Sequence, residues 1–424
     1  MKVYLDTIGC RLNQAELESY ARQFRAAGHT LVADPQEADL AVVNTCAVTS
    51  AAASDSRQKV RQIGRAGASQ IVLTGCWATL QPAQAASLPG VGKVVPNSAK
   101  DWLVPEVLQI PPERFDLEPI ERQPIPGARG RTRAFVKVQD GCENRCTFCV
   151  TTLARGPSCS RPIPTVLSEL RACGEAQEVV LTGVHLGSWG GDLEPALGLR
   201  HLVQAILEET EVPRVRLSSL EPWDLETSFF QLWENPRLCR HLHLPLQSGC
   251  AATLKRMRRK TSPESFAELV EAARRAIPGL AITTDVITGF PGETQAEFDE
   301  SLAFVEAMRF AGGHVFTYSA RPGTAAARML EQVPTAIRKE RSARMRAVFE
   351  EASRAYRTAF LGEALPVLWE SATALDSQGW AMSGLTDNSL RVTARAPASL
   401  WNQIARVWLS ALTAEGLSGQ IEQI

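Results

Sequence analysis

Three cysteines that lie close together in the sequence, Cys142, Cys146 and Cys149, constrain this chain more than any other feature. They follow the apolar segment Ala134–Val138, which is typical of a β-strand, so they are expected in the loop at its carboxyl end. Three closely spaced thiolates can ligate three irons of a [4Fe–4S] cube and leave the fourth iron open. A structural zinc site is the alternative, but zinc takes four protein ligands, and no fourth Cys or His follows at a suitable spacing. The motif therefore predicts an iron–sulfur cluster with one open position.

Three further cysteines share one position, because each shortly follows a predicted strand. They are Cys10, Cys46 and Cys76, after the strands Val3–Thr7, Leu40–Asn44 and Ile71–Thr74. Helical patterns over 13–27 and 50–67 separate these strands, which indicates a parallel α/β domain. The carboxyl ends of parallel strands meet at one edge, so the three thiols are expected to converge there. Buried thiols that act as small hydrophobes are the alternative, but they do not explain the repeated position. The pattern predicts a second cluster.

The chain divides into four predicted parts. Residues 1–110 form the parallel α/β domain, and prolines concentrate in a linker-like stretch over 96–130. Residues 128–335 alternate strands and helices as in a partial (β/α)6 barrel, whose active site would lie at the carboxyl ends of the strands. The predicted strands are Ala134–Val138, Val179–Thr182, Val215–Ser218, His241–Leu246, Ile282–Ile287 and His314–Tyr318. A basic helical connector over 336–360 leads to a small antiparallel β domain over 361–424.

The composition excludes several classes of protein. No apolar run reaches the length of about 18 residues that a membrane span needs, and the N-terminal segment lacks the pattern of a secretory signal. A cytoplasmic protein is therefore expected, in which ten cysteines ligate metal or pack rather than form disulfides. Packing is expected for Cys159, Cys173, Cys239 and Cys250, and core or pocket lining for His241 and His243. No phosphate-binding loop of an ATPase or dinucleotide reductase occurs.

Positive charge is local, because the net charge is only −1. Basic residues concentrate in 128–161, 255–260 and 335–360, and such clusters can track phosphates, although solvated faces are the usual reason for a charge run. Arg256, Arg258 and Arg259 are the predicted nucleic-acid contacts.

The Cys-x3-Cys-x2-Cys motif resembles that of the radical S-adenosylmethionine superfamily. With Cys10, Cys46 and Cys76 before it and a β domain after it, the whole chain resembles the methylthiotransferase family, with its cluster domain, radical domain and C-terminal TRAM domain. Further stretches carry the resemblance: 218–221 (SSLE), 243–249 (HLPLQSG), 285–293 (DVITGFPGE) and 362–370 (GEALPVLWE).

This resemblance implies two [4Fe–4S] clusters and S-adenosylmethionine. The cluster at Cys142 would cleave S-adenosylmethionine to a radical that removes hydrogen from an unactivated C–H bond, and the cluster at Cys10 would hold the sulfur of the methylthio group. Cofactor contacts are expected from residues in the cysteine motif and at later strand ends, any of which could instead be an ordinary turn or cap. They are Phe148, Thr182, Gly183, Ser219, Glu221, Gln247, Asp285, Gly289, Tyr318 and Ser319.

Three substrates occur in this family: isopentenyladenosine in tRNA, threonylcarbamoyladenosine in tRNA, and an aspartate of a ribosomal protein. The runs 44–49 (NTCAVT), 137–142 (KVQDGC) and 181–187 (LTGVHLG) are most similar to the threonylcarbamoyladenosine branch, which modifies C2 of the base at position 37. The basic clusters also favour tRNA. Against this, residues 361–424 hold six acids and three arginines, which suits a basic protein partner better. A flavodoxin- or ferredoxin-like protein is the expected electron donor.

A protein that uses iron–sulfur clusters only for structure or electron transfer, without catalysis, is the alternative from another class. It would ligate every iron with protein groups, whereas each set here offers three cysteines.

Overall fold

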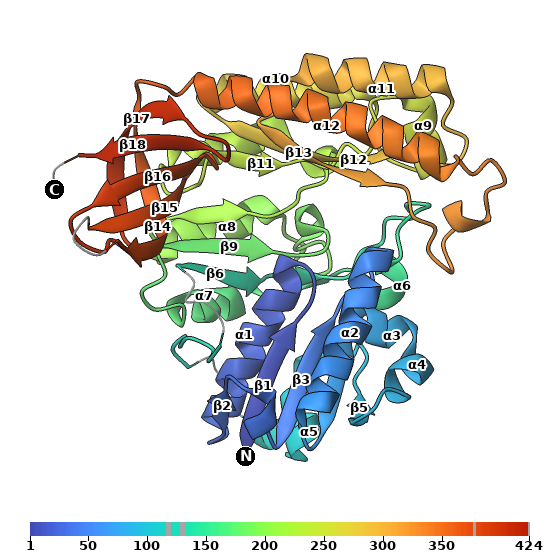
Figure 1. The fold of residues 1–424 in the computed structure, drawn as a ribbon, viewed down its shortest axis with the longest axis vertical. Helices are drawn as coiled ribbons and strands as arrows, with labels where there is room; N and C mark the ends of the chain where they lie inside the picture. The colour runs from blue at the N-terminus through green and yellow to red at the C-terminus, as the bar shows by residue number, and fades with distance from the viewer. Residues whose placement is uncertain (116–119, 128–131, 376–378, 423–424) are drawn as a thin grey trace.

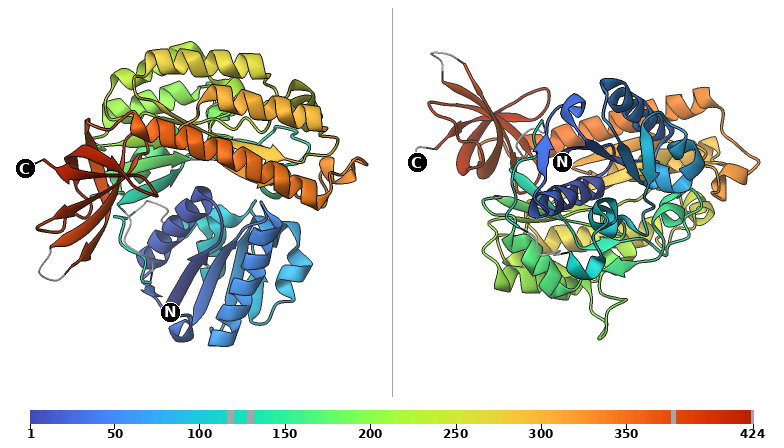
Figure 2. Two further views of the ribbon diagram at one scale, coloured as in Figure 1. Left: turned by 45° about the horizontal axis from the view of Figure 1, so that its top comes forward. Right: turned by 90° about the horizontal axis from the view of Figure 1, so that it is seen from below.

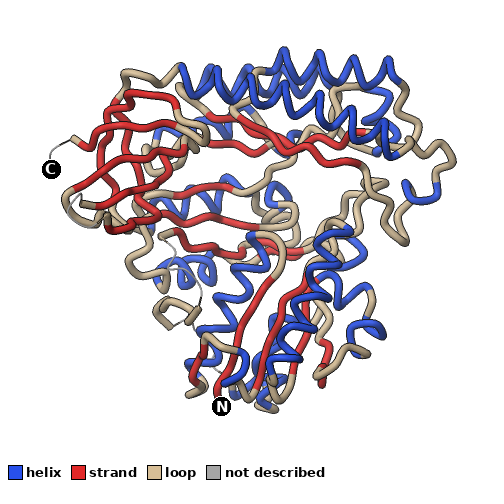
Figure 3. Tube along the Cα trace, in the orientation of Figure 1, coloured by secondary structure: helices blue, strands red, loops and turns tan. Residues whose placement is uncertain are grey.

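The computed structural model describes residues 1–115, 120–127, 132–375 and 379–422. A parallel sheet sandwiched by helices is followed by a strand–helix partial barrel and then by a small closed β-barrel (Figures 1 and 3). The predicted α/β fold class, with a small C-terminal β domain, is confirmed. Nowhere in the described part of the chain is a helix both long and apolar enough to cross a membrane.

The N-terminal sheet has the strand order β2-β1-β3-β4-β5, and all of its pairs are parallel. Its strands are β1 (Lys2–Thr7), β2 (Thr30–Val32), β3 (Leu40–Thr45), β4 (Ile71–Gly75) and β5 (Val91–Val94). Its helices are α1 (Arg11–Ala26), α2 (Ser50–Ala66), α3 (Cys76–Leu80), α4 (Pro82–Ala86) and α5 (Leu103–Leu108). The stretch predicted as a linker thus contains α5, and residues 116–119 and 128–130 of it lie outside the described residues.

Alternation along β3 produces the two faces of this sheet. Ala41 and Val43 pack with α2 on one face, whereas Leu40 and Val42 pack with α1 and α5 on the other. Every residue of β3 is buried, as expected for a central strand covered on both sides. The carboxyl ends of β1 and β3 point toward the barrel (Figure 1).

The middle of the chain forms an open barrel of six parallel strands. The sheets β10-β9-β6 and β11-β12-β13 are joined by a parallel bridge between Ser219 and His243, which places the strands in chain order. The strands are β6 (Arg133–Lys137), β9 (Glu178–Thr182), β10 (Val215–Leu217), β11 (His241–His243), β12 (Ala281–Thr288) and β13 (Gly312–Thr317). The helices are α6 (Thr151–Arg155), α7 (Ile163–Arg171), α8 (Leu199–Glu209), α9 (Ala251–Met257), α10 (Pro263–Ala276) and α11 (Gln295–Met308).

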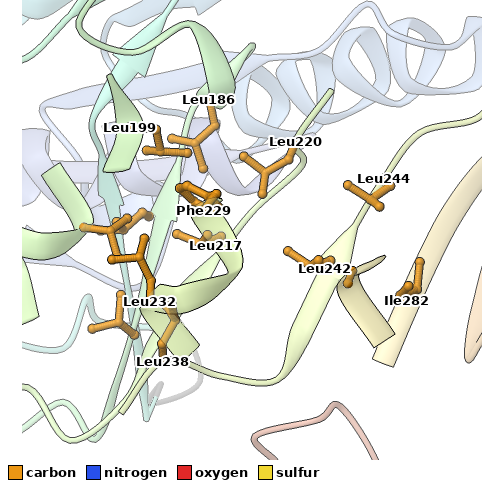
Figure 4. Packing of buried hydrophobic residues seen from close by; sticks show 14 of the residues in the cluster. Leu186, Leu199, Leu217, Leu220, Phe229, Leu232, Leu238, Leu242, Leu244 and Ile282 are labelled. Atoms are coloured by element: carbon orange, nitrogen blue, oxygen red, sulfur yellow. The ribbon is translucent and has the colours of Figure 1, made fainter. Parts of the chain in front are cut away.

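All six predicted barrel strands are present, but the fourth is shorter than expected. It ends at His243 instead of Leu246, because Pro245 has no N–H to continue the ladder and Leu246 donates to the Thr284 hydroxyl instead. Leucine and isoleucine side chains of successive strands form the barrel core; Figure 4 shows Leu217, Leu242 and Ile282 in this layer.

The C-terminal part is a closed barrel with the strand order β14-β15-β16-β18-β17. Its strands are β14 (Ala364–Ala374), β15 (Trp380–Thr386), β16 (Arg391–Ala396), β17 (Ile404–Leu412) and β18 (Leu417–Ile421). The expectation of wholly antiparallel pairing is wrong for β16 and β18, which are parallel. A ring with an odd number of strands must contain at least one parallel pair, and the short, polar β18 supplies the fifth strand.

The C-terminal barrel docks on the partial barrel through its acidic side chains. Glu370 contacts Arg133 at 2.7 Å, and Asp387 forms a paired contact with Arg240 at 2.6 and 3.1 Å. The long helix α12 (Thr335–Thr358) crosses the partial barrel and ends at the C-terminal barrel (Figure 2). The acids that gave this region its negative charge are therefore partly neutralised within the molecule.

The centre of this interface is a buried ion pair between Arg216 and Glu178. Glu178 Oε1 and Oε2 lie 2.7 and 3.1 Å from the guanidinium, and the two side chains are 1% and 0% exposed. Arg216 also donates to the Thr386 carbonyl and the Ser389 hydroxyl of the C-terminal barrel. This pair thus joins β9 and β10 to the last domain.

Replacing Glu178 with Gln should destabilise the protein strongly, because it leaves Arg216 charged and uncompensated in the interior. We expect a loss of about 3–5 kcal/mol in the free energy of unfolding, measured by urea denaturation. Glu209→Gln, at an exposed position of α8, is the control and should change stability by less than about 0.5 kcal/mol. Equal effects of the two substitutions would contradict the structural role of the pair.

Candidate iron–sulfur and S-adenosylmethionine site

The loop that carries Cys142, Cys146 and Cys149 begins at the carboxyl end of β6 and closes on itself. The Cys142 N–H donates to the Gly156 carbonyl at 3.0 Å, and the short strands β7 (Gln139–Asp140) and β8 (Cys159–Ser160) pair behind it. Gly141 precedes Cys142 with φ +70°, and a Cβ there would lie 1.7 Å from the Pro157 carbonyl oxygen, so no other residue fits.

Hydrogen-bond donors surround the thiols of this loop. The backbone N–H of Asn144 lies 3.4 Å from Cys142 Sγ, and that of Thr151 lies 3.3 Å from Cys149 Sγ. The guanidinium of Arg259 lies 3.8 Å from Cys146 Sγ. Hydrogen bonds to cysteine sulfurs are one of the ways in which a protein tunes an iron–sulfur cluster.

The structure brings Cys10, Cys46 and Cys76 together at the carboxyl edge of the N-terminal sheet. Cys10 caps α1, Cys46 follows β3, and Cys76 begins α3 after β4. A Cβ on Gly9 would lie 2.8 Å from Cys46 Cβ, so the loop before Cys10 touches Cys46. Burial raises the pKa of Cys46 to about 11, and the neighbouring Cys10 and Cys76 raise it as well.

The two cysteine sets lie on facing parts of the molecule, and Arg155 connects them. Its Nε donates to Cys76 Sγ at 3.3 Å, and its Nη2 donates to Asn13 Oδ1 at 2.8 Å in the N-terminal domain. Its Nη1 lies 3.0 Å from both Glu16 and Asp140. Arg155 ends α6, which follows Cys149 directly, so one side chain links both cysteine loops.

Two lysines complete this buried charge network. Lys100 contacts Glu16 at 2.6 Å and Asp140 at 2.5 Å, and Lys137 contacts Asp140 at 3.5 Å. Burial opposes the ionisation of Glu16, but Arg155, Lys100 and Lys137 together hold the pKa of Glu16 at about 2. The network therefore joins α1 to the first barrel strand and the residues after it by charge pairs that are largely buried.

Two family models and several known proteins match this chain. Residues 2–95 match the Uncharacterized protein family UPF0004, and residues 136–305 match the Radical SAM superfamily. A relative from Bacillus subtilis, described as threonylcarbamoyladenosine tRNA methylthiotransferase MtaB, is 34% identical over 96% of this chain and 93% of its own. The chain belongs to the radical S-adenosylmethionine methylthiotransferase family.

Further relatives and folds agree with this assignment. The Thermotoga maritima protein of the same description is 36% identical over 87% of this chain and 86% of its own. A tRNA-2-methylthio-N(6)-dimethylallyladenosine synthase from Sphingopyxis alaskensis is 32% identical over 94% of this chain and 96% of its own. The radical S-adenosylmethionine methyltransferase TsrM from Kitasatospora setae has the same fold, with a TM-score of 0.60 over 77% of this chain and 75% of that one at 14% identity.

The radical methylthiotransferase family implies a [4Fe–4S] cluster and S-adenosylmethionine, and the Cys142 loop fits this cluster. Its donors are three thiols, and backbone and guanidinium N–H groups are directed at their sulfurs. Among the described residues, no three His, Cys, Asp or Glu side chains are arranged to hold a single metal ion. A [4Fe–4S] cube does not require three ligands around one ion, because each thiolate binds a different iron.

Polar atoms without partners at the carboxyl ends of the strands suit a polar cofactor. Within the described part of the chain, Ser218 Oγ, Asp285 Oδ1, Thr288 Oγ1 and the Tyr318 hydroxyl are buried without a hydrogen bond. Ser218 and Tyr318 follow β10 and β13, Thr288 ends β12, and Asp285 lies three residues before that end, on the side of the barrel that carries the Cys142 loop. Buried polar atoms are normally satisfied, so their concentration here is consistent with a bound molecule.

Several predicted cofactor residues of this methylthiotransferase lie together. Phe148 and Tyr318 each pack edge-on against Phe290, with ring centroids 6.4 and 5.4 Å apart. Thr182 ends β9, and a Cβ on Gly183 would lie 2.7 Å from Gln139 Oε1. These residues border the cysteine loop and remain proposals as cofactor contacts.

Other predicted contacts have structural partners in this chain. A Cβ on Gly289 would lie 2.1 Å from Arg338 Cγ, so helix packing explains this glycine. Gln247 bridges β12 through its backbone at φ +73°, and Asp285 Oδ2 lies 3.2 Å from His243 Nε2. Ser219 forms the bridge to β11 described above, and the Ser319 hydroxyl lies 2.9 Å from that of Ser50 at the start of α2.

The prediction that Arg256, Arg258 and Arg259 contact nucleic acid needs correction, because Arg259 is buried. Arg259 is only 9% exposed and forms a paired contact with Glu221 at 3.0 and 2.6 Å. It also stacks on Trp223, with 4.5 Å between the guanidinium carbon and the ring centroid. Arg256 is held by Glu297 at 2.9 and 2.7 Å, which leaves Arg258 as the exposed member of the three.

Sequence reasoning missed residues whose partners come from distant segments. Gln139 is fully buried, and its side chain accepts from the His185 N–H and donates to the Asp140 and Gly141 carbonyls. Burial lowers the pKa of His185, but hydrogen bonds with Asp224 and Cys142 raise it to about 9. The sequence did place His185 three residues after β9, at a strand end of the barrel, and this position could have marked it as a site residue.

The Arg155–Glu16 contact should couple the two domains measurably. A double-mutant cycle with Arg155→Gln and Glu16→Gln should give an interaction energy of about 1–3 kcal/mol in urea unfolding, because both side chains are nearly fully buried. The control cycle uses the exposed pair Arg344 and Asp299, which solvent screens and for which a much smaller interaction energy is expected. A buried pair that couples no more strongly than the exposed pair would refute this role.

Proposed function

We propose that this chain is a tRNA methylthiotransferase that places a methylthio group on C2 of N6-threonylcarbamoyladenosine at position 37, next to the anticodon. The convergence of two separate sets of three cysteines, linked by Arg155, carries the proposal. The second set, Cys10, Cys46 and Cys76, would hold an auxiliary [4Fe–4S] cluster.

The chain's own residues position the reaction. When bound, the clusters and S-adenosylmethionine supply the one-electron chemistry and the sulfur that an unactivated C–H bond requires. Arg259 and Glu221 form an ion pair beside Cys146. Phe148 is partly exposed and packs on the buried Phe290, so it offers an aromatic face for an adenine ring.

The charge distribution supports an RNA substrate. Arg145 and Arg258 are exposed, and the Thr147 N–H bonds to the Met257 carbonyl, so these arginines belong to neighbouring loops at the cysteine end of the barrel. Exposed cations of this kind neutralise phosphates. Two of the six acids that favoured a basic protein partner, Glu370 and Asp387, are ion-paired with the partial barrel, which weakens that alternative.

The choice of base rests on relatives and on the sequence runs noted above. Proteins described as threonylcarbamoyladenosine methylthiotransferases are 33–36% identical to this chain, and the dimethylallyladenosine synthases named among its relatives are 29–33% identical. We further expect the enzyme to act in the cytoplasm and to receive electrons from a flavodoxin- or ferredoxin-like protein.

Nucleoside analysis tests the substrate directly. Deleting the gene should remove 2-methylthio-N6-threonylcarbamoyladenosine from total tRNA and leave its unmethylthiolated precursor, as measured by mass spectrometry. Complementation by the wild-type chain should restore the product, whereas a Cys142→Ala chain should not. Loss of methylthiolated isopentenyladenosine, or of a methylthio-aspartate in a ribosomal protein, would identify one of the alternative substrates and refute this one.

Iron content tests the auxiliary cluster through Gly9. Gly9→Ala would drive a Cβ to 2.8 Å from Cys46 Cβ, so the reconstituted protein should lose about four of about eight irons per chain. Gly28→Ala is the matched control, because Gly28 also has positive φ, +79°, but nothing lies within 4 Å of its added Cβ. Full iron content in Gly9→Ala would argue against a cluster at this site.

A further inference from the structure

The segment that follows β13 spans the gap between the two cysteine loops. The Ser319 hydroxyl lies 2.9 Å from that of Ser50, which is four residues after Cys46. Further along, the Ala326 N–H donates at 2.8 Å to the carbonyl of Thr147, inside the Cys142 loop. Arg321 lies between these two contacts, at the sixth strand end of the barrel.

Arg321 differs from every other buried arginine of the described chain. It is 8% exposed, its Nη2 is buried without a hydrogen-bond partner, and no described carboxylate pairs with it. The five other arginines below 10% exposure all bond to a carboxylate or a carbonyl: Arg22 to Glu169, Arg214 to Pro366, Arg216 to Glu178, Arg259 to Glu221 and Arg341 to Glu293.

A buried guanidinium without a counterion is unfavourable, because it has lost its hydration and gained no partner. Its planar fork of N–H groups matches a carboxylate or a phosphate, which it can bind through two parallel hydrogen bonds. An anionic ligand would therefore satisfy Arg321 at the place where the chain itself does not.

The surroundings of Arg321 suit a nucleoside as the carrier of that anion. Leu153 and Val48 expose 57% and 53% of their surface; Leu153 lies in α6, four residues after Cys149, and Val48 lies two residues after Cys46. Gly323, two residues after Arg321, lies against Leu153, since a Cβ there would be 3.2 Å from Leu153 Cδ1. Apolar side chains beside a buried cation fit a flat base with a charged substituent.

We propose that Arg321 is a substrate-binding residue that pairs with an oxyanion of the nucleotide being modified; this inference rests on the proposed tRNA substrate. The oxyanion is either the carboxylate of the threonylcarbamoyl group or the phosphate of the same nucleotide. Both present two oxygens to the guanidinium, and binding of either one would hold the base between the cysteine sets.

The test measures binding of anticodon stem-loop RNA to the reconstituted, cluster-loaded protein under anaerobic conditions. One RNA carries threonylcarbamoyladenosine at position 37 and the other carries adenosine. Arg321→Gln should weaken binding of the threonylcarbamoyl RNA by at least about tenfold, as expected when one partner of a buried charge pair is removed. Arg328→Gln, at an exposed position of the same segment, should change the affinity by less than about threefold.

The second RNA separates the two sources of the anion. A loss confined to the threonylcarbamoyl RNA identifies the carboxylate, and an equal loss on both RNAs identifies the phosphate. Thermal unfolding of the same proteins separates binding from structure: Arg321→Gln should be at least as stable as the wild type, since it removes an unpaired buried charge. A purely structural arginine would lower the Tm.

Two results would overturn the inference while leaving the proposed function intact. One is unchanged affinity of Arg321→Gln for both RNAs. The other is loss of RNA-free S-adenosylmethionine cleavage in Arg321→Gln, which would place the anion on S-adenosylmethionine. If the wild-type protein binds neither RNA, the proposed function and this inference both fail.

Discussion

The hydrogen bonds of Arg155 determine how the two halves of the site lie relative to each other. Arg155 is the last residue of α6, which follows the Cys142 loop, and its guanidinium donates to Cys76 and Asn13 of the N-terminal domain. Glu16 and Asp140 lie beside its charge and also pair with Lys100. Lys137 pairs with Asp101, so the three cations face three carboxylates and burial does not leave an isolated ion. Such a network is sensitive to the loss of any member, which makes it suited to fixing one geometry.

The positions of the cysteines could be predicted from sequence because each depends on local information. A short apolar run followed by a cysteine places that thiol at a strand end, and parallel topology then brings Cys10, Cys46 and Cys76 to one edge. The same reasoning found the six barrel strands. These predictions required no knowledge of which side chains contact one another or of how the domains are placed.

The roles of charged residues could not be predicted in this way, since they depend on which distant group lies opposite. Arg259 is one of a run of basic residues in sequence, yet in the fold it faces Glu221 and Cys146. Glu370 and Asp387 contribute to an acidic tail in sequence, yet in the fold they pair with the barrel. The parallel pair of β16 and β18 was missed for a similar reason, because it follows from closure of the ring and not from either strand.

These pairings change what the net charge of the chain means for RNA binding. Cations that have internal carboxylate partners cannot neutralise phosphate, and acids that have internal cations do not repel it. The exposed Arg145 and Arg258, and Arg321, with which no described carboxylate pairs, therefore matter more than the total of −1. All three belong to segments at the cysteine end of the barrel, so positive charge is available at the place where a nucleotide would have to enter. An almost neutral protein can in this way present a cationic site to a polyanion.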